Sequence, residues 1–177
     1  RFTINNQRFT FRVGAIIVEN DCVLYAKNEL ADYYYSIGGA VQMGETAQEA
    51  IIREVYEETG VHYEIDHLAV IHETFFYNKI KQIEGTECHE LSLYFKMKSR
   101  GSQELHSDST VLGVKEYVNW LPIADLDQYK AFPAFLKDYF PYQMPNIRAS
   151  LPKFQFRQDF LFFRQNSHTI RYMRVQV

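Results

Sequence analysis

The segment from Gly39 to Val61 constrains the fold most, because it reads as a glycine-rich loop followed by a helix whose two ends are both marked. Thr46 followed three residues later by Glu49 is a capping-box pattern, which predicts Thr46 as the N-cap. Gly60 stands where a left-handed residue commonly ends a helix. We therefore expect a helix over residues 47 to 59.

Three acidic side chains lie on one side of this expected helix. Glu54, Glu57 and Glu58 are spaced i, i+3, i+4, and such positions share a side at 3.6 residues per turn. Like charges this close repel by on the order of a few tenths of a kcal/mol per pair, so a cation is needed nearby. Arg53 is one candidate, and a hard divalent cation such as Mg²⁺, which prefers oxygen ligands, is the other.

The same segment resembles the signature of the Nudix hydrolases. That signature reads Gly, five residues, Glu, seven residues, Arg-Glu-aliphatic, one residue, Glu-Glu, one residue, Gly-aliphatic. Every specified position is filled, by Gly39, Glu45, Arg53, Glu54, Val55, Glu57, Glu58, Gly60 and Val61. A solvated amphipathic helix would explain single glutamates, but it does not explain the glycines and the arginine at their spacing.

The resemblance implies a function and a site. Nudix enzymes hydrolyse the pyrophosphate linkage of a nucleoside diphosphate joined to another group, with Mg²⁺ as cofactor and Mn²⁺ as a substitute. By carry-over, the metal ligands are Glu54, Glu57, Glu58 and the backbone carbonyl of Gly38, and Glu45 pairs with Arg53 to orient the glutamates. The implied catalytic set is Glu45, Arg53, Glu54, Glu57 and Glu58. The alternative is a nucleotide-sensing module without catalysis, because a fold alone does not fix function.

The general base stays open at this point. The family offers two kinds of residue. One is a glutamate of the signature segment Gly39 to Val61, called the box from here on, and here this is Glu54. The other is a carboxylate on a distant loop. The carboxylates outside the box that could serve are Glu90, Glu104, Asp108 and Glu116. His89 could touch a phosphate, but a lone histidine at a strand edge is more often a structural hydrogen-bonding residue.

The order of the remaining segments is rich in strands and fits an α/β/α sandwich with a mixed sheet, which is also the Nudix architecture. We expect one domain over residues 1–177, with an N-terminal hairpin at 1–12 turning at Asn5-Asn6. A second helix is expected from Asp125 to Tyr139, broken by Pro133. Further strands are expected at Val13 to Val18, Val23 to Tyr25, Leu68 to Phe76, Leu91 to Met97 and Val114 to Trp120.

The last part of the chain, residues 147–177, differs in composition from the rest. Its charged residues are six basic and one acidic, and aromatic residues are interleaved with them. Two strand-like runs, Phe154 to Arg164 and Thr169 to Val177, flank a turn, so we expect an added hairpin that covers an edge strand or pairs with the N-terminal hairpin. A homodimer contact and a basic wall facing the substrate's phosphates are the alternatives.

Composition limits the partners and the compartment. The chain has 177 residues, 46% of them hydrophobic, which suffices for one sizeable core. A net charge of −3 makes nucleic acid an improbable partner, so a small nucleotide is the expected substrate. Cys22 and Cys88 are too few for a disulfide framework. No apolar run of membrane-spanning length and no N-terminal signal pattern occurs, so we expect a cytoplasmic protein.

Overall fold

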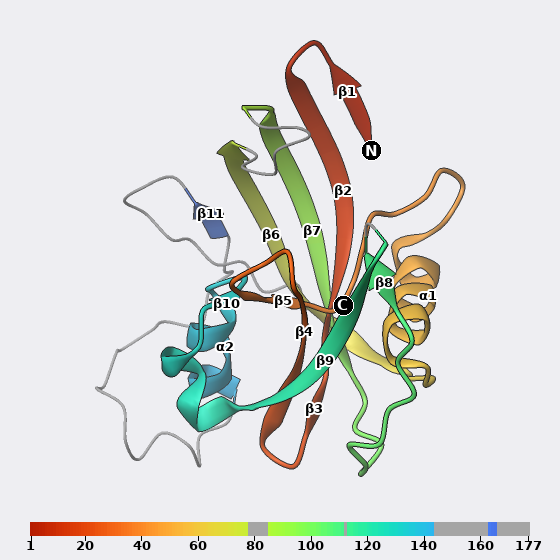
Figure 1. The fold of residues 1–177 in the computed structure, drawn as a ribbon, viewed down its shortest axis with the longest axis vertical. Coiled ribbons are helices and arrows are strands. Elements are labelled where there is room, and N and C mark those ends of the chain that lie inside the picture. The colour runs from red at the N-terminus through yellow and green to blue at the C-terminus, as the bar shows by residue number, and fades with distance from the viewer. Residues whose placement is uncertain (78–84, 112, 144–162, 166–177) are drawn as a thin grey trace.

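The computed structural model describes residues 1–77, 85–111, 113–143 and 163–165. Its strands form two sheets (Figure 1). The first sheet has the order β1 (Phe2–Ile4), β2 (Gln7–Ile16), β7 (Glu87–Met97), β6 (Ile65–Tyr77), β11 (Phe163–Gln165). The second has the order β10 (Ala131–Phe132), β5 (Tyr34–Ser36), β4 (Cys22–Asn28), β9 (Val114–Pro122), β8 (Thr110–Val111), with β3 (Val18–Glu19) beside β4.

Strand β2 is the element against which the glycine loop is held. It pairs in parallel with β7, whereas β6 pairs with β7 in the antiparallel sense, so the sheet is mixed as expected. On its other side, the amides of Val13 and Ala15 donate to the carbonyl oxygens of Gly39 and Ile37, each at 2.9 Å. The loop that precedes the helix is therefore fixed to the sheet by backbone hydrogen bonds.

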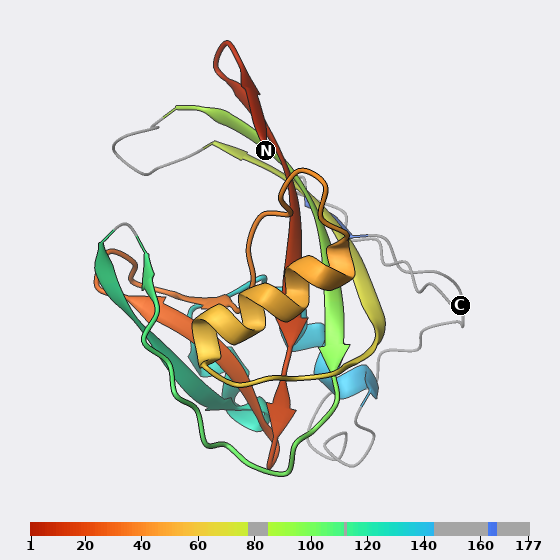
Figure 2. The ribbon, with the colours of Figure 1, turned by 90° about the vertical axis from the view of Figure 1, so that its right-hand side faces the viewer.

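Two helices cover opposite faces of the strands, which confirms the predicted α/β/α sandwich (Figures 1 and 2). Helix α1 (Ala47–Thr59) packs through Ile51 and Val55 into a core that contains Ala15. Helix α2 (Leu136–Gln143) belongs to a second core that contains Ile16. Neighbouring residues of one strand point to opposite faces, so this alternation along β2 builds both cores.

The ends of α1 are those predicted from the sequence. The Thr46 hydroxyl accepts a hydrogen bond from the Glu49 amide at 3.2 Å, and the Thr46 amide donates to the Glu49 carboxylate at 2.9 Å. Gly60 follows the last turn with φ 70°, in the left-handed region, and its amide donates to the Tyr56 carbonyl oxygen. Both caps satisfy backbone groups that a helix end would otherwise leave unpaired.

Two predicted elements have different bounds in the structure. The N-terminal hairpin is present, but its second strand does not stop at residue 12, because the apolar alternation continues and β2 runs unbroken to Ile16. The second helix, expected from Asp125 to Tyr139 with a break at Pro133, is present only in part. A 3-10 helix, η2 (Ile123–Gln128), and the short β10 replace its first part, and α2 begins only at Leu136. Pro133, which lacks an amide hydrogen, lies just before this start.

The C-terminal region is described only at β11, which pairs in parallel with β6 from Phe163↔His72 to Gln165↔Thr74. Most of the first predicted strand-like run and all of the second lie outside the described residues, so the hairpin stays a prediction. Among the described helices, none is long and apolar enough to cross a membrane.

Candidate active site

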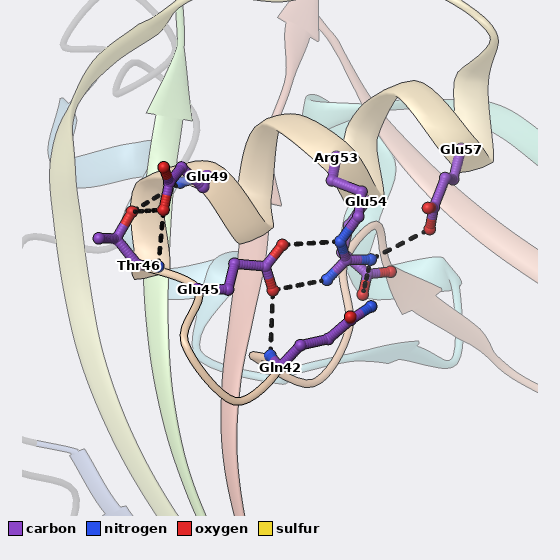
Figure 3. Close-up of polar contacts among 7 residues, drawn as sticks. All are labelled: Gln42, Glu45, Thr46, Glu49, Arg53, Glu54 and Glu57. Carbon is purple, nitrogen blue, oxygen red and sulfur yellow. Dashed lines mark hydrogen bonds and ion pairs between the residues drawn. The ribbon is translucent and has the colours of Figure 1, made fainter.

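Glu45 and Arg53 form the ion pair expected from the motif, and it ties the loop to the helix (Figure 3). Arg53 Nε and Nη2 donate to the two carboxylate oxygens of Glu45 at 2.7 and 3.0 Å. The Gln42 amide donates to the same carboxylate at 3.0 Å. These hydrogen bonds, that from Arg53 first, lower the pKa of Glu45 to about 2. Glu45 is therefore an anion that anchors the arginine.

Arg53 also holds two other box glutamates. Its Nη1 donates to Glu54 Oε1 at 2.8 Å and to Glu57 Oε2 at 3.1 Å. The neighbouring carboxylates, Glu45 first, raise the pKa of Arg53 further above its usual value. Figure 3 shows the guanidinium between the loop carboxylate and those of the helix. One arginine thus offsets much of the repulsion between the acidic side chains.

The two glycines of the loop are needed for different contacts. A Cβ at Gly39 would lie 2.2 Å from Glu54 Oε1, so the loop backbone rests directly on the Glu54 carboxylate. A Cβ at Gly38 would lie 2.2 Å from the Val13 carbonyl oxygen, and the φ of Gly38 is +134°. Gly39 therefore makes room for a site carboxylate, and Gly38 makes room for the neighbouring strand.

Glu58 is a buried carboxylate that lacks a full set of partners. Its Oε1 accepts a hydrogen bond from the Gly38 amide at 3.0 Å, whereas no described residue pairs with its buried Oε2. Burial and then the negative charge of Glu116 raise the pKa of Glu58 well above its ordinary value. Such a group is costly unless a cation or a proton accompanies it.

Glu116 is the candidate base that the fold brings to Glu58. It lies on β9 and is 2% exposed. Its carboxylate accepts hydrogen bonds from the Tyr35 hydroxyl at 2.5 Å and the Ser109 hydroxyl at 2.8 Å. Asn28 in turn donates to the Tyr35 oxygen at 2.9 Å. This network holds Glu116 in one orientation beside the motif helix.

The other candidates for the base lie elsewhere. Glu104 and Asp108 are exposed on the segment after β7, and the charge of Glu90, on β7, acts on Arg12. His89 pairs with Glu73 at 2.9 Å and stacks on the Phe75 ring at 4.3 Å, so it has the hydrogen-bonding environment of a structural histidine.

Sequence reasoning missed Arg12, which contacts the predicted metal site. Its Nη2 donates to the Gly38 carbonyl oxygen, the predicted metal ligand, at 2.7 Å. The signal that could have found it is a charged residue inside an otherwise apolar strand segment, between Phe11 and Val13. A charge at such a position is uncommon unless it is paired or functional.

The three predicted carboxylate ligands do not converge as one group. In the part of the chain that the structure describes, no three acidic, histidine or cysteine side chains are arranged to hold a metal ion. The side chain of Glu57 is 56% exposed and bonded to Arg53, whereas Glu54 lies under Gly39 and Glu58 is buried near Glu116. The structure therefore brings Glu54, Glu58 and the Gly38 backbone closest to the arrangement expected.

The fold has three layers, and a glycine loop lies over a glutamate-rich helix. Comparison with known proteins identifies the family that has this arrangement. The NUDIX domain family model matches residues 8–143. A search of curated protein sequences found no significant match.

Several solved structures share the fold. A MutT protein from Methanosarcina mazei Go1 is 18% identical, with a TM-score of 0.56 over 81% of this chain and 98% of its own. A NUDIX-family hydrolase from Clostridium perfringens is 20% identical, with a TM-score of 0.54 over 79% and 99%. The mMutator MutT protein from Bacillus halodurans is 18% identical, with a TM-score of 0.52 over 73% and 79%.

The chain belongs to the Nudix family. It is a Nudix hydrolase, an enzyme that acts on phosphoric anhydride bonds.

Proposed function

We propose that this enzyme is a metal-dependent hydrolase that cleaves the pyrophosphate linkage of a nucleoside diphosphate joined to another group. The observation that carries the proposal is the buried Oε2 of Glu58, which has no partner among the described residues and lies in a carboxyl group near Glu116. Two buried carboxylates this close are stable only if a proton or a cation accompanies them, and a bound cation would allow both to ionise. The donor set consists of carboxylate and carbonyl oxygens, which suits Mg²⁺, with Mn²⁺ as a substitute.

The residues that would hold the metal are the Gly38 carbonyl, Glu54, Glu57 and Glu58. A metal ion held there would supply Lewis-acid polarisation of a phosphoryl oxygen and a lowered pKa for the attacking water. Arg53 and Glu45 would act on the glutamates and not on the substrate, because the Arg53 guanidinium already donates to three carboxylates. Their role in this proposal is to fix the ligands before substrate arrives.

The proton acceptor would be Glu54 or Glu116. Glu54 belongs to the motif helix and Glu116 lies on β9, and the charges of both act on the pKa of Glu58. Glu104 and Asp108 are exposed, so we no longer favour them. A general base must lie within hydrogen-bond reach of the attacking water, directly or through one further water.

The test is a hydrolysis panel of nucleoside triphosphates, nucleotide sugars and dinucleotides, with Mg²⁺, with Mn²⁺ and with EDTA. We expect phosphate-containing products only with metal, and a loss of at least about 100-fold in turnover for Glu58→Gln and Glu54→Gln. Glu49→Gln is the matched control on the same helix, because glutamine still completes a capping box. Tight binding of a nucleotide without any product would overturn the proposal in favour of a sensing module.

The sequence also led to predictions about the substrate, the cellular location and the oligomeric state. A nucleotide is the substrate we propose, whereas the cytoplasmic location and the homodimer stay predictions.

A further inference from the structure

Arg12 is a half-buried cation at the edge of the site, with a function that the family motif does not assign. Its position on β2 is opposite Ser92 of β7 in the strand register, and an isolated bridge joins it to Ala40 of the glycine loop. Its Nη2 donates to the Gly38 carbonyl oxygen at 2.7 Å. Because the same carbonyl is a proposed metal ligand, the guanidinium would lie next to a metal ion bound there.

Arg12 is a cation, as arginine always is in proteins, and the carboxylates whose charge acts on it include Glu90, Glu58 and Glu54. In the described part of the chain, no carboxylate forms a direct ion pair with Arg12, and Gly38 is the only hydrogen-bond acceptor it contacts. A guanidinium has five N–H groups, so most of its donors are available to a ligand.

We infer that Arg12 is a substrate-binding residue that donates to a non-bridging phosphoryl oxygen of the diphosphate beside the metal. This inference rests on the proposed function. A divalent ion held by Glu54, Glu57 and Glu58 would be neutralised by three carboxylates, so the site would have little positive charge left to attract an anionic diphosphate. Arg12 supplies a positive charge beside the Gly38 carbonyl, to which its guanidinium is hydrogen-bonded.

The geometry of the guanidinium suits this function. Its planar fork matches the spacing of phosphate oxygens, and hydrogen bonds between charged groups are about twice as strong as neutral ones. The bond to Gly38 fixes the orientation of the fork before substrate binds, which lowers the entropy lost on binding. A purely structural function, in which Arg12 only fixes the Gly38 carbonyl, makes a different prediction about metal affinity.

The experiment compares two equilibria in the full chain by calorimetry. The first is binding of Mn²⁺ alone, and the second is binding of methylenediphosphonate, a non-hydrolysable diphosphate, at saturating Mn²⁺. For Arg12→Gln we expect diphosphonate affinity to fall by about 10- to 100-fold, while Mn²⁺ affinity stays within about threefold. Arg100→Gln is the matched control with the same change of charge, because Arg100 is exposed and lies over the Tyr63 ring.

Two results would overturn the inference. One is unchanged diphosphonate affinity in Arg12→Gln, and the other is a loss confined to Mn²⁺ affinity, which would make Arg12 a positioning residue for Gly38. If Arg12→Gln does not fold by circular dichroism, Arg12→Lys decides the question. Lysine keeps the charge but not the fork, so we expect diphosphonate affinity to fall by about 3- to 10-fold, and an unchanged value refutes the inference.

The outcome is separable from that of the proposed function. If the wild-type protein hydrolyses nothing in the panel, the proposed function fails. Diphosphonate binding that depends on Arg12 would still support the phosphate contact in that case.

Discussion

Alanine at Gly39 should damage the site and leave the fold nearly intact. The added Cβ would lie 2.2 Å from Glu54 Oε1 and 2.4 Å from Oε2. To reach an ordinary contact distance, the Glu54 carboxylate must move by about 1 Å, which a flexible side chain can do by rotating away. A misplacement of about 1 Å in a reacting geometry can cost on the order of 100-fold in rate, and we expect that loss in turnover.

The loss of stability in Gly39→Ala should be small. The moving carboxylate gives up its hydrogen bond from Arg53, a partly exposed contact at 2.8 Å, which is worth about 1 kcal/mol or less. For a chain of this length, about 1 kcal/mol lowers Tm by about 2 to 4 °C. Thermal unfolding followed by circular dichroism measures this shift, and a Mn²⁺ titration measures the damage to the site.

Gly38→Ala is the comparison variant, because it should lose much more stability than Gly39→Ala. There a Cβ would lie 2.2 Å from the Val13 carbonyl oxygen and 2.9 Å from the Gly14 Cα, both backbone atoms, at a φ of +134°. Backbone cannot rotate away, so overpacking and strain should cost about 3 kcal/mol or more, or about 6 to 12 °C in Tm. The reasoning is refuted if the Gly39 variant unfolds as early as the Gly38 variant, or if it keeps full turnover.

Three further substitutions test the electrostatics and the cap. Glu58→Gln should raise the Tm of the metal-free protein at neutral pH. The raised pKa of Glu58 means that the free energy of unfolding of the wild type falls as pH rises above 4.5 towards that pKa. Thermal melts without Mn²⁺ should show the higher Tm of the variant, and melts with Mn²⁺ should show that the metal no longer stabilises it. Glu45→Gln should lower the Tm of the protein above pH 4.5. The difference in Tm from the wild type should vanish as pH falls to about 2, the lowered pKa of Glu45, and melts at acid pH measure this difference. Thr46→Ala should remove about 1 kcal/mol of helix capping and lower Tm by about 2 to 4 °C.

Local patterns predicted the motif helix because its determinants lie within a short segment. Thr46, Glu49 and Gly60 act on backbone groups of the same helix, and Glu45 is eight residues from Arg53. The i, i+3, i+4 spacing places both adjacent glutamates on one face, although Glu58 also lies three residues after the buried Val55. Residues 57 and 58 differ by about 100° around a helix, and in the structure the first is exposed and the second buried.

The remaining parts of the site depend on contacts between distant segments. Glu116 lies near Glu58 because β9 pairs with β4. Tyr35, which is 81 residues from Glu116 in sequence, donates a hydrogen bond to the Glu116 carboxylate. Arg12 reaches Gly38 across 26 residues because the loop runs along β2. Such pairings follow from the packing of the whole chain. A charge within an apolar strand could have marked Arg12 as unusual, but no local pattern names its partner Gly38.

The parallel pairing of β2 with β7 has a consequence for how the enzyme forms during synthesis. Gln7 and Glu87, at one end of this pairing, are 80 residues apart, and pairings between such distant residues form slowly because loop closure precedes any gain in contacts. A nascent chain that has reached Val61 already contains the complete motif. It acquires the Glu116 side of the site only after β9 has emerged and docked on β4, so activity should appear late in folding, after the motif helix itself.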